Sequence, residues 1–467
     1  MTEPRYDVVG IGLGPFNLGL AALLDGLDGE DVDACFFEQD AEMSWHEGML
    51  IEGTSLEVPF LADLVTLADP TNPHSFLNYL RETGRIYEFY FYETFQIPRR
   101  EYNDYLRWVA ERLDSTRFSR RVTDVHWDAT EDAFRVEAID PETDEEIVCL
   151  ADDVALGVGS RPHVPEHLQG HPDRDVFHTS RYLHRRERCL DADSITVVGS
   201  GQSAAEVFLD LLQRQPDGDY RLDWLTRSEG FFPMEYSKLG LQHFTPEYTQ
   251  YFYDLPQERK DEVREGQDLL YKGIDPDTSA NIYDTLYRRS IGDRDPDVGL
   301  FAMSEVEDIE ARDGAYRLDC RQWQTDEAFV HDSEVVVLGT GYHRPIPSFL
   351  SPLGDRIAFD DQSRFRVTAD YRLETDLPGR LFVQNADLHT HGVGAPDLGM
   401  GCYRNACIVN QLVGREVYPE DTDTVFQDFA VEEFVERTPG TDRETTDRQE
   451  PDARHGTHAS TPPEDRS

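Results

Sequence analysis

The chain has 467 residues and a formal net charge of −49 at pH 7, from 93 acidic and 44 basic side chains. This length suffices for two or three domains with a large buried core. The charge excludes nucleic acid and anionic membranes as partners, because both bind basic surfaces.

The acidic residues are spread along the whole chain, and the basic residues are arginine except for Lys238, Lys260 and Lys272. Acid-rich, lysine-poor surfaces keep a protein soluble when salt screens charge repulsion. This composition is typical of halophiles, so we expect a cytoplasmic protein of a halophile. The alternative is an acidic protein of a mesophile.

No membrane association or export is expected. No secretory signal precedes Tyr6, and no apolar run approaches the length needed to span a bilayer. The six cysteines contain no Cys-x-x-Cys pair. Buried thiols in a reducing compartment are therefore favoured over a redox pair of Cys402 and Cys407.

The chain opens with a strand–turn–helix pattern. An apolar run from Tyr6 to Ile11 leads into a glycine turn, and apolar residues then recur at helical spacing from Phe16 to Leu27. A second strand is predicted from Asp33 to Phe37, and it ends on Glu38. This is the pattern of a βαβ nucleotide-binding unit.

The same pattern returns about 190 residues later, which predicts a second nucleotide-binding domain. A strand is expected at Ser194 to Val198, a glycine turn at Gly199 to Gly201, and a helix running to about Leu212. The next strand is expected at Tyr220 to Thr226.

Two further apolar runs, Val154 to Val158 and Val335 to Leu338, end in the glycine-rich turns GVGSRP and GTGYHRP. We interpret them as the places where the chain leaves the first domain and returns to it. The prediction is an α/β fold with two Rossmann-like domains and a small, mostly helical substrate region. The expected boundaries are 1–165 and 331–436 for the first nucleotide-binding domain, 166–330 for the second with a substrate insertion at about 230–290, and 437–467 for a disordered tail that has almost no apolar content.

The first turn reads Gly10-Ile11-Gly12-Leu13-Gly14-Pro15. Glycines allow a tight turn and close approach to a pyrophosphate, which binds at the N-terminus of the following helix. We place Pro15 at the third glycine position of the fingerprint, where proline suits the first turn of a helix. Glu38 stands where an acidic side chain binds a ribose hydroxyl.

The second turn reads Gly199-Ser200-Gly201-Gln202-Ser203-Ala204, and Arg227 instead of an acid follows its second strand. Arginine at this place can pair with a ribose 2′-phosphate, which favours NADPH over NADH. The alternative is an ordinary surface arginine.

Two dinucleotide domains in one chain predict hydride transfer from a nicotinamide to a flavin. Flavin disulfide reductases need a cysteine pair near the first helix or the second fingerprint, and neither place has one. Oxygen is therefore the expected electron acceptor.

Eight stretches resemble the lysine and ornithine N-monooxygenases, flavin-dependent N-hydroxylating enzymes of siderophore pathways. In chain order they are YDVVGIGLGPFNLGLAAL, FFEQDAEMSWHEGML, FLADLVTLADPTNPHSFLNYL, PRREYNDYLRWVAE, VVGSGQSAAEVFLDLL, FTPEY, VVVLGTGY and HTHGVGAPDL. The resemblance extends from about residue 5 to about residue 415. It implies that reduced flavin forms a C4a-hydroperoxide, whose distal oxygen is attacked by a neutral primary amine.

The resemblance also implies the cofactor contacts. FAD is expected on Gly10, Gly12, Gly14 and Glu38, with Trp45 and His46 beside the isoalloxazine; NADPH is expected on Gly199, Gly201, Gln202, Ser203 and Arg227; and Gly339 to Tyr342, including Gly341, matches the family's threonine-glycine-tyrosine strand end. Trp45 could instead be core and His46 a satisfied polar group. We interpret the loop with His389 and His391 as one that closes over flavin, not as a metal site, because further ligands at metal spacing are missing. The family's relatives are often dimers or tetramers, so a homo-oligomer is possible.

The chain departs from the amino-acid hydroxylases at two substrate positions. By the resemblance, ornithine and lysine enzymes carry a lysine that grips the substrate carboxylate where this chain has Ala62. Ornithine enzymes carry an asparagine where this chain has Leu241. A buried carboxylate without a partner is costly. The prediction is therefore a small diamine as substrate.

Acidic residues around the pocket would suit a second ammonium group. Glu57 stands where relatives usually have glutamine, and PMEYSKL, which contains Glu235 and Lys238, resembles members that hydroxylate diamines. Asn281 completes the predicted substrate residues. Lysine or ornithine remains the alternative substrate if Lys238, Arg288 or Arg289 takes over the carboxylate. A Baeyer–Villiger type monooxygenase and a non-catalytic flavoprotein are the more distant alternatives.

Overall fold

A computed structural model of the chain describes residues 3–27, 32–292, 296–420 and 424–430. The tail expected to be disordered, 437–467, lies outside the described residues. No helix within the described ranges combines the length and apolarity needed to cross a membrane.

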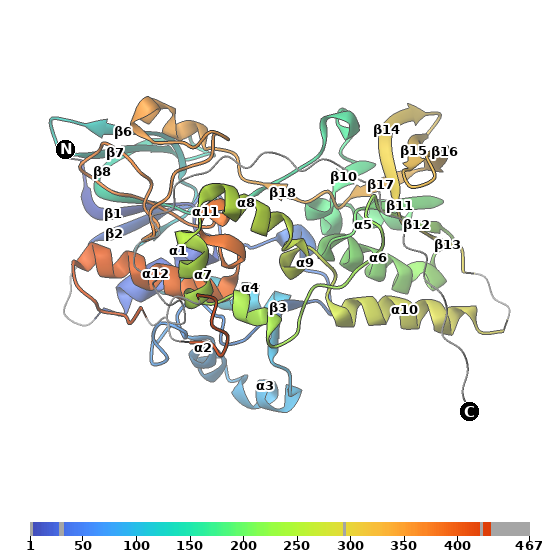
Figure 1. Cartoon of the computed structure of the whole chain (residues 1–467), viewed down its shortest axis with the longest axis horizontal. Helices are drawn as coiled ribbons and strands as arrows, with labels where there is room; N and C mark the ends of the chain where they lie inside the picture. Colours follow the sequence, from blue (N-terminus) through green and yellow to red (C-terminus); the bar gives the residue numbers. More distant parts are fainter. Residues whose placement is uncertain (1–2, 28–31, 293–295, 421–423, 431–467) are drawn as a thin grey trace, which may run out of the picture. The chain divides into compact units, whose positions relative to one another are not determined.

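The first sheet has the strand order β5-β2-β1-β8-β7-β6, and β19 pairs with β8 (Figure 1). Its parallel strands are β1 (Arg5–Ile11), β2 (Ala34–Phe37), β5 (Thr116–Arg117), β8 (Glu146–Leu156) and β19 (Leu381–Val383). The antiparallel strands β6 (Arg121–Asp128) and β7 (Ala133–Ile139) extend it. The register pairs Val9 with Cys35 and with Val154, so the three apolar runs lie side by side in the core.

Helices α1 (Pro15–Asp25), α4 (Arg99–Ala110) and α12 (Leu398–Val413) belong to the core of this domain. Helix α1 is buried along almost its whole length: nine of its eleven residues are buried, and it packs against α12, α4 and β2. It ends at Asp25, two residues before the predicted end, because Gly26 caps it.

The second sheet is entirely parallel, with the order β10-β17-β11-β12-β13. The strands are β10 (Val176–His178), β11 (Ser194–Val198), β12 (Arg221–Leu225), β13 (Val298–Phe301) and β17 (Val335–Leu338). Helices α5 (Tyr182–Leu190) and α6 (Gln202–Arg214) pack with this sheet, as does a three-stranded antiparallel sheet of β14 (Ser304–Arg312), β15 (Ala315–Gln322) and β16 (Glu327–Ser333). The predicted α/β fold with two Rossmann-like domains is confirmed.

The chain crosses between the two sheets at a short antiparallel pair of β9 (Arg161–Pro162) and β18 (Tyr342–His343). The first domain is therefore discontinuous. The predicted return at residue 331 is wrong, because β17 hydrogen-bonds to β10 and β11 of the second sheet. The return lies after Leu338, in the turn that leads to β18.

The remaining elements are mostly short helices. The region predicted to hold substrate is helical, with α7 (Pro246–Asp254), α8 (Gln257–Glu265), α9 (Asp268–Tyr271) and α10 (Pro276–Ser290). The first domain adds β3 (Ser55–Pro59), β4 (Gln96–Pro98), α2 (Phe76–Glu82), α3 (Ile86–Tyr92) and α11 (Leu388–His391).

Candidate active site

The first glycine turn has a different register from the one expected. Gly10 lies inside β1, where a Cβ would meet the Phe36 ring at 2.0 Å. Gly12 makes the turn with φ of +82°, and Gly14 caps α1. Gly199, with φ of +125°, and Gly201, which caps α6, hold the corresponding places in the second turn. The fingerprint is therefore Gly12-x-Gly14 instead of Gly10-x-Gly12.

In this register the third fingerprint position is Asn17, and Pro15 is simply the first residue of α1. The buried Asn17 amide donates to the carbonyl oxygens of Gly12 at 2.7 Å and Ala155 at 3.2 Å. It joins α1 to the ends of β1 and β8, as a small third residue does in other fingerprints. The spacing of Asn17 from Gly12 and Gly14 is visible in the sequence, but the additional glycine at position 10 allows a second register for the fingerprint.

Both turns leave room for a phosphate group. A Cβ on Gly14 or on Gly201 would meet nothing within 4 Å, although each residue stands directly before a helix. Free backbone N–H groups and the helix dipole favour an anion at such a place. These residues therefore fit two pyrophosphates.

The strand-end residues lie where the sequence predicted. The Glu38 carboxylate accepts from the backbone N–H of Leu13 at 2.8 Å, so it lies at the first glycine turn. Arg227 follows β12, and its side chain is 79% exposed. The neighbouring Ser228 hydroxyl is 2.9 Å from the Ser200 hydroxyl of the second turn. Ser203 lies in the first turn of α6.

An aromatic group lies beside the crossing between the domains. The Trp45 and His46 ring centroids are 4.6 Å apart, and the Tyr342 ring is 6.0 Å from His46 and 5.0 Å from His178. His178 also contacts the Gly341 carbonyl oxygen at 2.9 Å. The structure thus brings the four residues that the resemblance placed near flavin and the strand end into one group.

His46 has backbone and electrostatic features of a binding site. Its φ of +53° is unusual for a residue other than glycine. Its side chain is exposed, yet the protein around it and the charge of Arg99 lower the pKa of His46 to about 4. This imidazole is therefore neutral at pH 7.

A buried ion pair joins the two domains, and its arginine is the one whose charge acts on His46. Arg99, at the start of α4, donates to both carboxylate oxygens of Glu206 on α6 at 2.7 Å, and the two side chains are 13% and 2% exposed. The PRREY motif by itself gives Arg99 no role, because its partner lies 107 residues away.

Gln202 links this ion pair to Glu57 and α10. Its side-chain nitrogen lies 3.3 Å from a Glu57 oxygen and 3.0 Å from a Glu206 oxygen, and its oxygen accepts from the Asp275 backbone N–H at 2.7 Å. Burial, and then the charges of Asp275 and Glu206, raise the pKa of Glu57 to about 8. Gln202, a predicted cofactor residue, therefore contacts Glu57, a predicted substrate residue. We call Gln202 and its partners Glu57, Glu206 and Asp275 the Glu57 junction.

The other predicted substrate residues are only partly brought together. Ala62 is 5% exposed and belongs to a loop that the buried Asp63 carboxylate organises through bonds to the N–H groups of Val65, Thr66 and Phe76. The loop after β12 reaches Glu57, because the Tyr236 hydroxyl donates to the Glu57 carbonyl oxygen at 2.7 Å.

Glu235 and Lys238 in this loop are exposed, Leu241 is half-buried, and Asn281 is exposed on α10. The described contacts do not bring Asn281 to Glu57. The residues of α10 that reach the junction are its cap Asp275 and Thr278, whose hydroxyl is 3.2 Å from Gln202. The Asp-Pro sequence before α10 is a start signal for a helix, but it carried no functional information.

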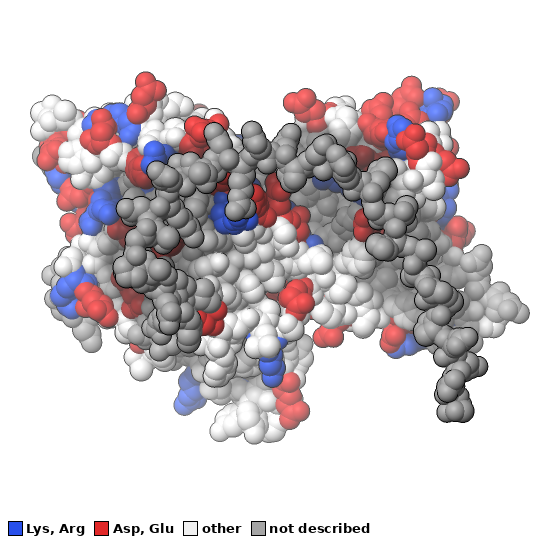
Figure 2. Space-filling model, viewed as in Figure 1, with Lys and Arg blue, Asp and Glu red and all other residues white. Residues whose placement is uncertain are grey.

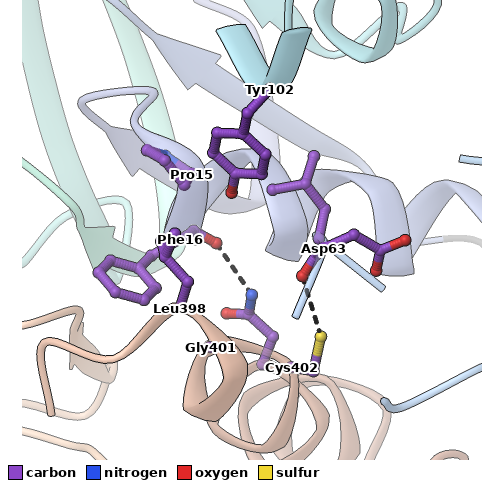
Figure 3. A pocket seen from close by; sticks show the side chains of 9 residues that line it. Pro15, Phe16, Asp63, Tyr102, Leu398, Gly401 and Cys402 are labelled. Carbon is purple, nitrogen blue, oxygen red and sulfur yellow. Dashed lines mark hydrogen bonds between the residues drawn. The ribbon is translucent and has the colours of Figure 1, made fainter. Parts of the chain in front are cut away.

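A small cavity lies where the first turns of α1 and α12 meet the loop after Ala62 (Figure 3). In Figure 3, Phe16 and Leu398 lie to the left, Tyr102 above and Cys402 to the lower right. The Asn405 side-chain amide donates to the Phe16 carbonyl oxygen at 2.9 Å. The Cys402 sulfur lies 3.4 Å from the Asp63 carbonyl oxygen. The Ala62 loop therefore borders the start of the helix that carries the first glycine turn.

His389 and His391 contact the chain segment 365–371. His389 Nε2 is 2.7 Å from the Phe365 carbonyl oxygen, and His391 stacks on Tyr371 with centroids 4.4 Å apart. Among the described residues no group of three or more His, Cys, Asp or Glu side chains could hold a metal ion.

Comparison with known proteins agrees with this geometry. The family pattern described as L-lysine 6-monooxygenase/L-ornithine 5-monooxygenase matches residues 4–344. A putrescine N-hydroxylase of Shewanella oneidensis is 40% identical over 437 residues, covering 92% of this chain and 86% of that protein.

Two solved structures are similar over most of their length. The FAD-bound cadaverine monooxygenase of the desferrioxamine pathway of Erwinia amylovora is 42% identical, with a TM-score of 0.87 over 91% of this chain and 98% of that one. The Kutzneria ornithine N-hydroxylase with reduced FAD, NADP+ and L-ornithine is 27% identical, with a TM-score of 0.82 over 88% of this chain and 99% of that one. The chain therefore belongs to the L-lysine 6-monooxygenase/L-ornithine 5-monooxygenase family of flavin-dependent N-hydroxylating enzymes.

Proposed function

We propose that this enzyme uses FAD and NADPH to hydroxylate a primary amine nitrogen of a small diamine, as a step toward a hydroxamate siderophore. The observation that carries the proposal is the change of charge at the predicted substrate positions: Glu57 lies beside Gln202, and the residues expected to grip a substrate carboxylate are replaced by the apolar Ala62 and Leu241.

The two glycine turns support the cofactors. The open N-terminus of α1, with Glu38 beside it, would hold the FAD pyrophosphate and ribose, and α6 with Arg227 would hold NADPH. Bound FAD, reduced by NADPH, would supply the activated oxygen for the amine. The chain's own task is to exclude water and to present the amine in its uncharged form, which a desolvated site favours.

The basic side chains that could bind a substrate carboxylate in place of the family's lysine either pair with other residues of the chain or are exposed. Arg289 donates to the Gln215 side chain at 2.8 Å and to the Leu212 carbonyl oxygen, both at the end of α6. Arg288 pairs with Asp284 on the outside of α10 at 3.0 Å, and Lys238 is exposed. Arg99 is already neutralised by Glu206. These placements disfavour lysine and ornithine as substrates.

The relatives support the same choice. The putrescine and cadaverine enzymes are 40% and 42% identical to this chain, whereas the ornithine enzyme is 27% identical. Other relatives are named for the biosynthesis of the siderophores rhizobactin and alcaligin.

The test is hydroxylamine formation from diaminopropane, putrescine, cadaverine, ornithine and lysine with added FAD and molar KCl, driven by NADPH or by NADH. Product from diamines, with NADPH preferred, is the expected result. Product from lysine or ornithine alone would overturn the proposal that the substrate is a diamine. Oxidation of NADPH that yields only hydrogen peroxide with all five amines would overturn the proposed reaction.

We further propose that the enzyme works at the high salt concentration of a halophile's cytoplasm. The formal charge of −49 supports this, and so do the acidic side chains that recur over the visible face in Figure 2.

We also propose that copies of the chain associate through α3. This helix has no buried residue and exposes Tyr87, Tyr90, Phe91 and Tyr92. Contiguous aromatic surface is unusual on a monomer and typical of an interface. Light scattering at molar KCl is the test, and a monomer at all concentrations would overturn the proposal.

A further inference from the structure

We propose that Asp397 binds the ammonium group of the diamine that is not oxidised. The inference rests on the proposed diamine substrate and assigns the residue that selects for it.

Asp397 is fixed at the N-terminus of α12. Its backbone N–H donates to the Gly394 carbonyl oxygen at 3.1 Å, and its carboxylate Oδ1 accepts from the Met400 backbone N–H at 3.2 Å. One carboxylate oxygen is thus used for the helix cap. The residue is half-buried, so it also presents surface to a ligand.

The position that lost the family's lysine is next to this carboxylate. The point that a Cβ on Gly399 would occupy lies 3.0 Å from Asp397 Oδ1 and 3.5 Å from the Ala62 Cβ. A lysine at 62 would therefore reach Asp397 and neutralise it. With alanine at 62, none of the described ion pairs involves the Asp397 carboxylate, so the charge at this place is negative instead of balanced.

Tyr236 connects this end of the pocket to the Glu57 junction. Its hydroxyl donates to the Glu57 carbonyl oxygen, and the charges of Glu57, Asp275 and Asp397 all act to raise the pKa of Tyr236. Tyr236 therefore lies at the Glu57 junction, and Asp397 is one of the charges that act on its hydroxyl. A diamine lying along the Tyr236 ring would have one nitrogen at each end.

The electrostatics suit an ammonium group. Burial raises the pKa of Asp397 to about 6, against the backbone N–H groups of Met400 and Gly399 and the more distant Arg404. A cation in contact with a desolvated carboxylate stabilises its ionised form. A charge-assisted hydrogen bond of this kind is stronger than a neutral one.

The test is Asp397→Asn, because asparagine caps a helix as well as aspartate does and removes only the charge. Rates are compared for putrescine and butylamine, and for cadaverine and pentylamine, which lack the second nitrogen. We expect kcat/KM for the diamines to fall about 10- to 100-fold, with little change for the monoamines. Asp284→Asn, which removes an exposed carboxylate of α10, is the matched control and should leave both rates unchanged.

Three outcomes would overturn the assignment. Unchanged diamine kinetics would place the second nitrogen elsewhere. An equal decrease in kcat/KM for diamines and monoamines, with a lowered melting temperature, would show that Asp397 acts only as the cap of α12. If the unaltered enzyme hydroxylated lysine or ornithine and no diamine, the proposed function itself would fail, which the unaltered enzyme alone reveals.

Discussion

At the scale of single residues, the substrate preference depends on Ala62. This residue is buried in the loop organised by Asp63, and a Cβ on Gly399, in the first turn of α12, would lie 3.5 Å from its methyl group. The charge balance of the pocket is therefore set by one side chain on each of two elements.

Ala62→Lys should lower diamine kcat/KM at least about 10-fold, because the new ammonium group would pair with Asp397 and repel the substrate cation. Steady-state kinetics with putrescine measure this. Ala62→Met, which fills similar space without charge, is the control. Equal effects of lysine and methionine would mean that volume matters and charge does not.

Glu57 gives a second prediction at this scale, on stability and pH. Its pKa is raised to about 8 in the folded protein, above the ordinary value of 4.5. The folded state thus holds a proton that the unfolded state releases. The contribution of Glu57 to the free energy of unfolding is therefore fully present below pH 4.5 and decreases as the pH rises toward 8. The decrease is about 2 kcal/mol after allowance for solvent screening.

Glu57→Gln removes this titration. The melting temperature of the variant relative to the unaltered enzyme should therefore increase between pH 5 and pH 8. Calorimetric scans across this range measure the difference. A constant difference would show that Glu57 titrates as an ordinary exposed carboxylate.

At the scale of elements, the Arg99–Glu206 pair joins the start of α4 to α6. Both side chains are buried, so removing one leaves an uncompensated charge. The pair also holds Gln202, which contacts Glu57 and α10. Loss of the pair would therefore disturb the second cofactor turn, at Gln202, and the start of α10.

Arg99→Met should lower the free energy of unfolding by about 3–5 kcal/mol. The double variant Arg99→Met with Glu206→Met should lose less than the single variant, because no buried charge remains. Urea titrations of the three proteins measure this. A double variant less stable than the single variant would contradict the argument.

At the scale of the whole molecule, the excess of acidic side chains governs the response to salt. Like charges at a net −49 repel one another in the compact state, and salt screens that repulsion.

The melting temperature should therefore rise by several degrees between 0.1 and 2 M KCl, which corresponds to an increase of about 1–2 kcal/mol in the free energy of unfolding. Differential scanning fluorimetry at pH 7.5 measures the rise. At pH 4, where carboxylates begin to be protonated, the rise should be smaller. A melting temperature that falls with KCl at pH 7.5 would contradict the role of surface charge.

The sequence was sufficient for the features that depend on neighbouring residues. Strands β11 and β17 begin and end at the predicted residues, because apolar runs bounded by glycine turns specify buried parallel strands locally. It was insufficient for the register of the first turn. Gly10, Gly12 and Gly14 allow two readings of the fingerprint, and only the backbone conformation distinguishes a strand residue from the turn.

By itself, then, the sequence determined the two Rossmann-like domains, their glycine turns and the family, because short-range periodicity and ordered motifs carry this information. Only the tertiary structure decided which distant residues meet. It brought Arg99 to Glu206 and Gln202 to Glu57 across 107 and 145 residues, and it set Ala62 beside Asp397. Contacts of this kind depend on how the domains pack, and nothing in the local pattern of either partner encodes them.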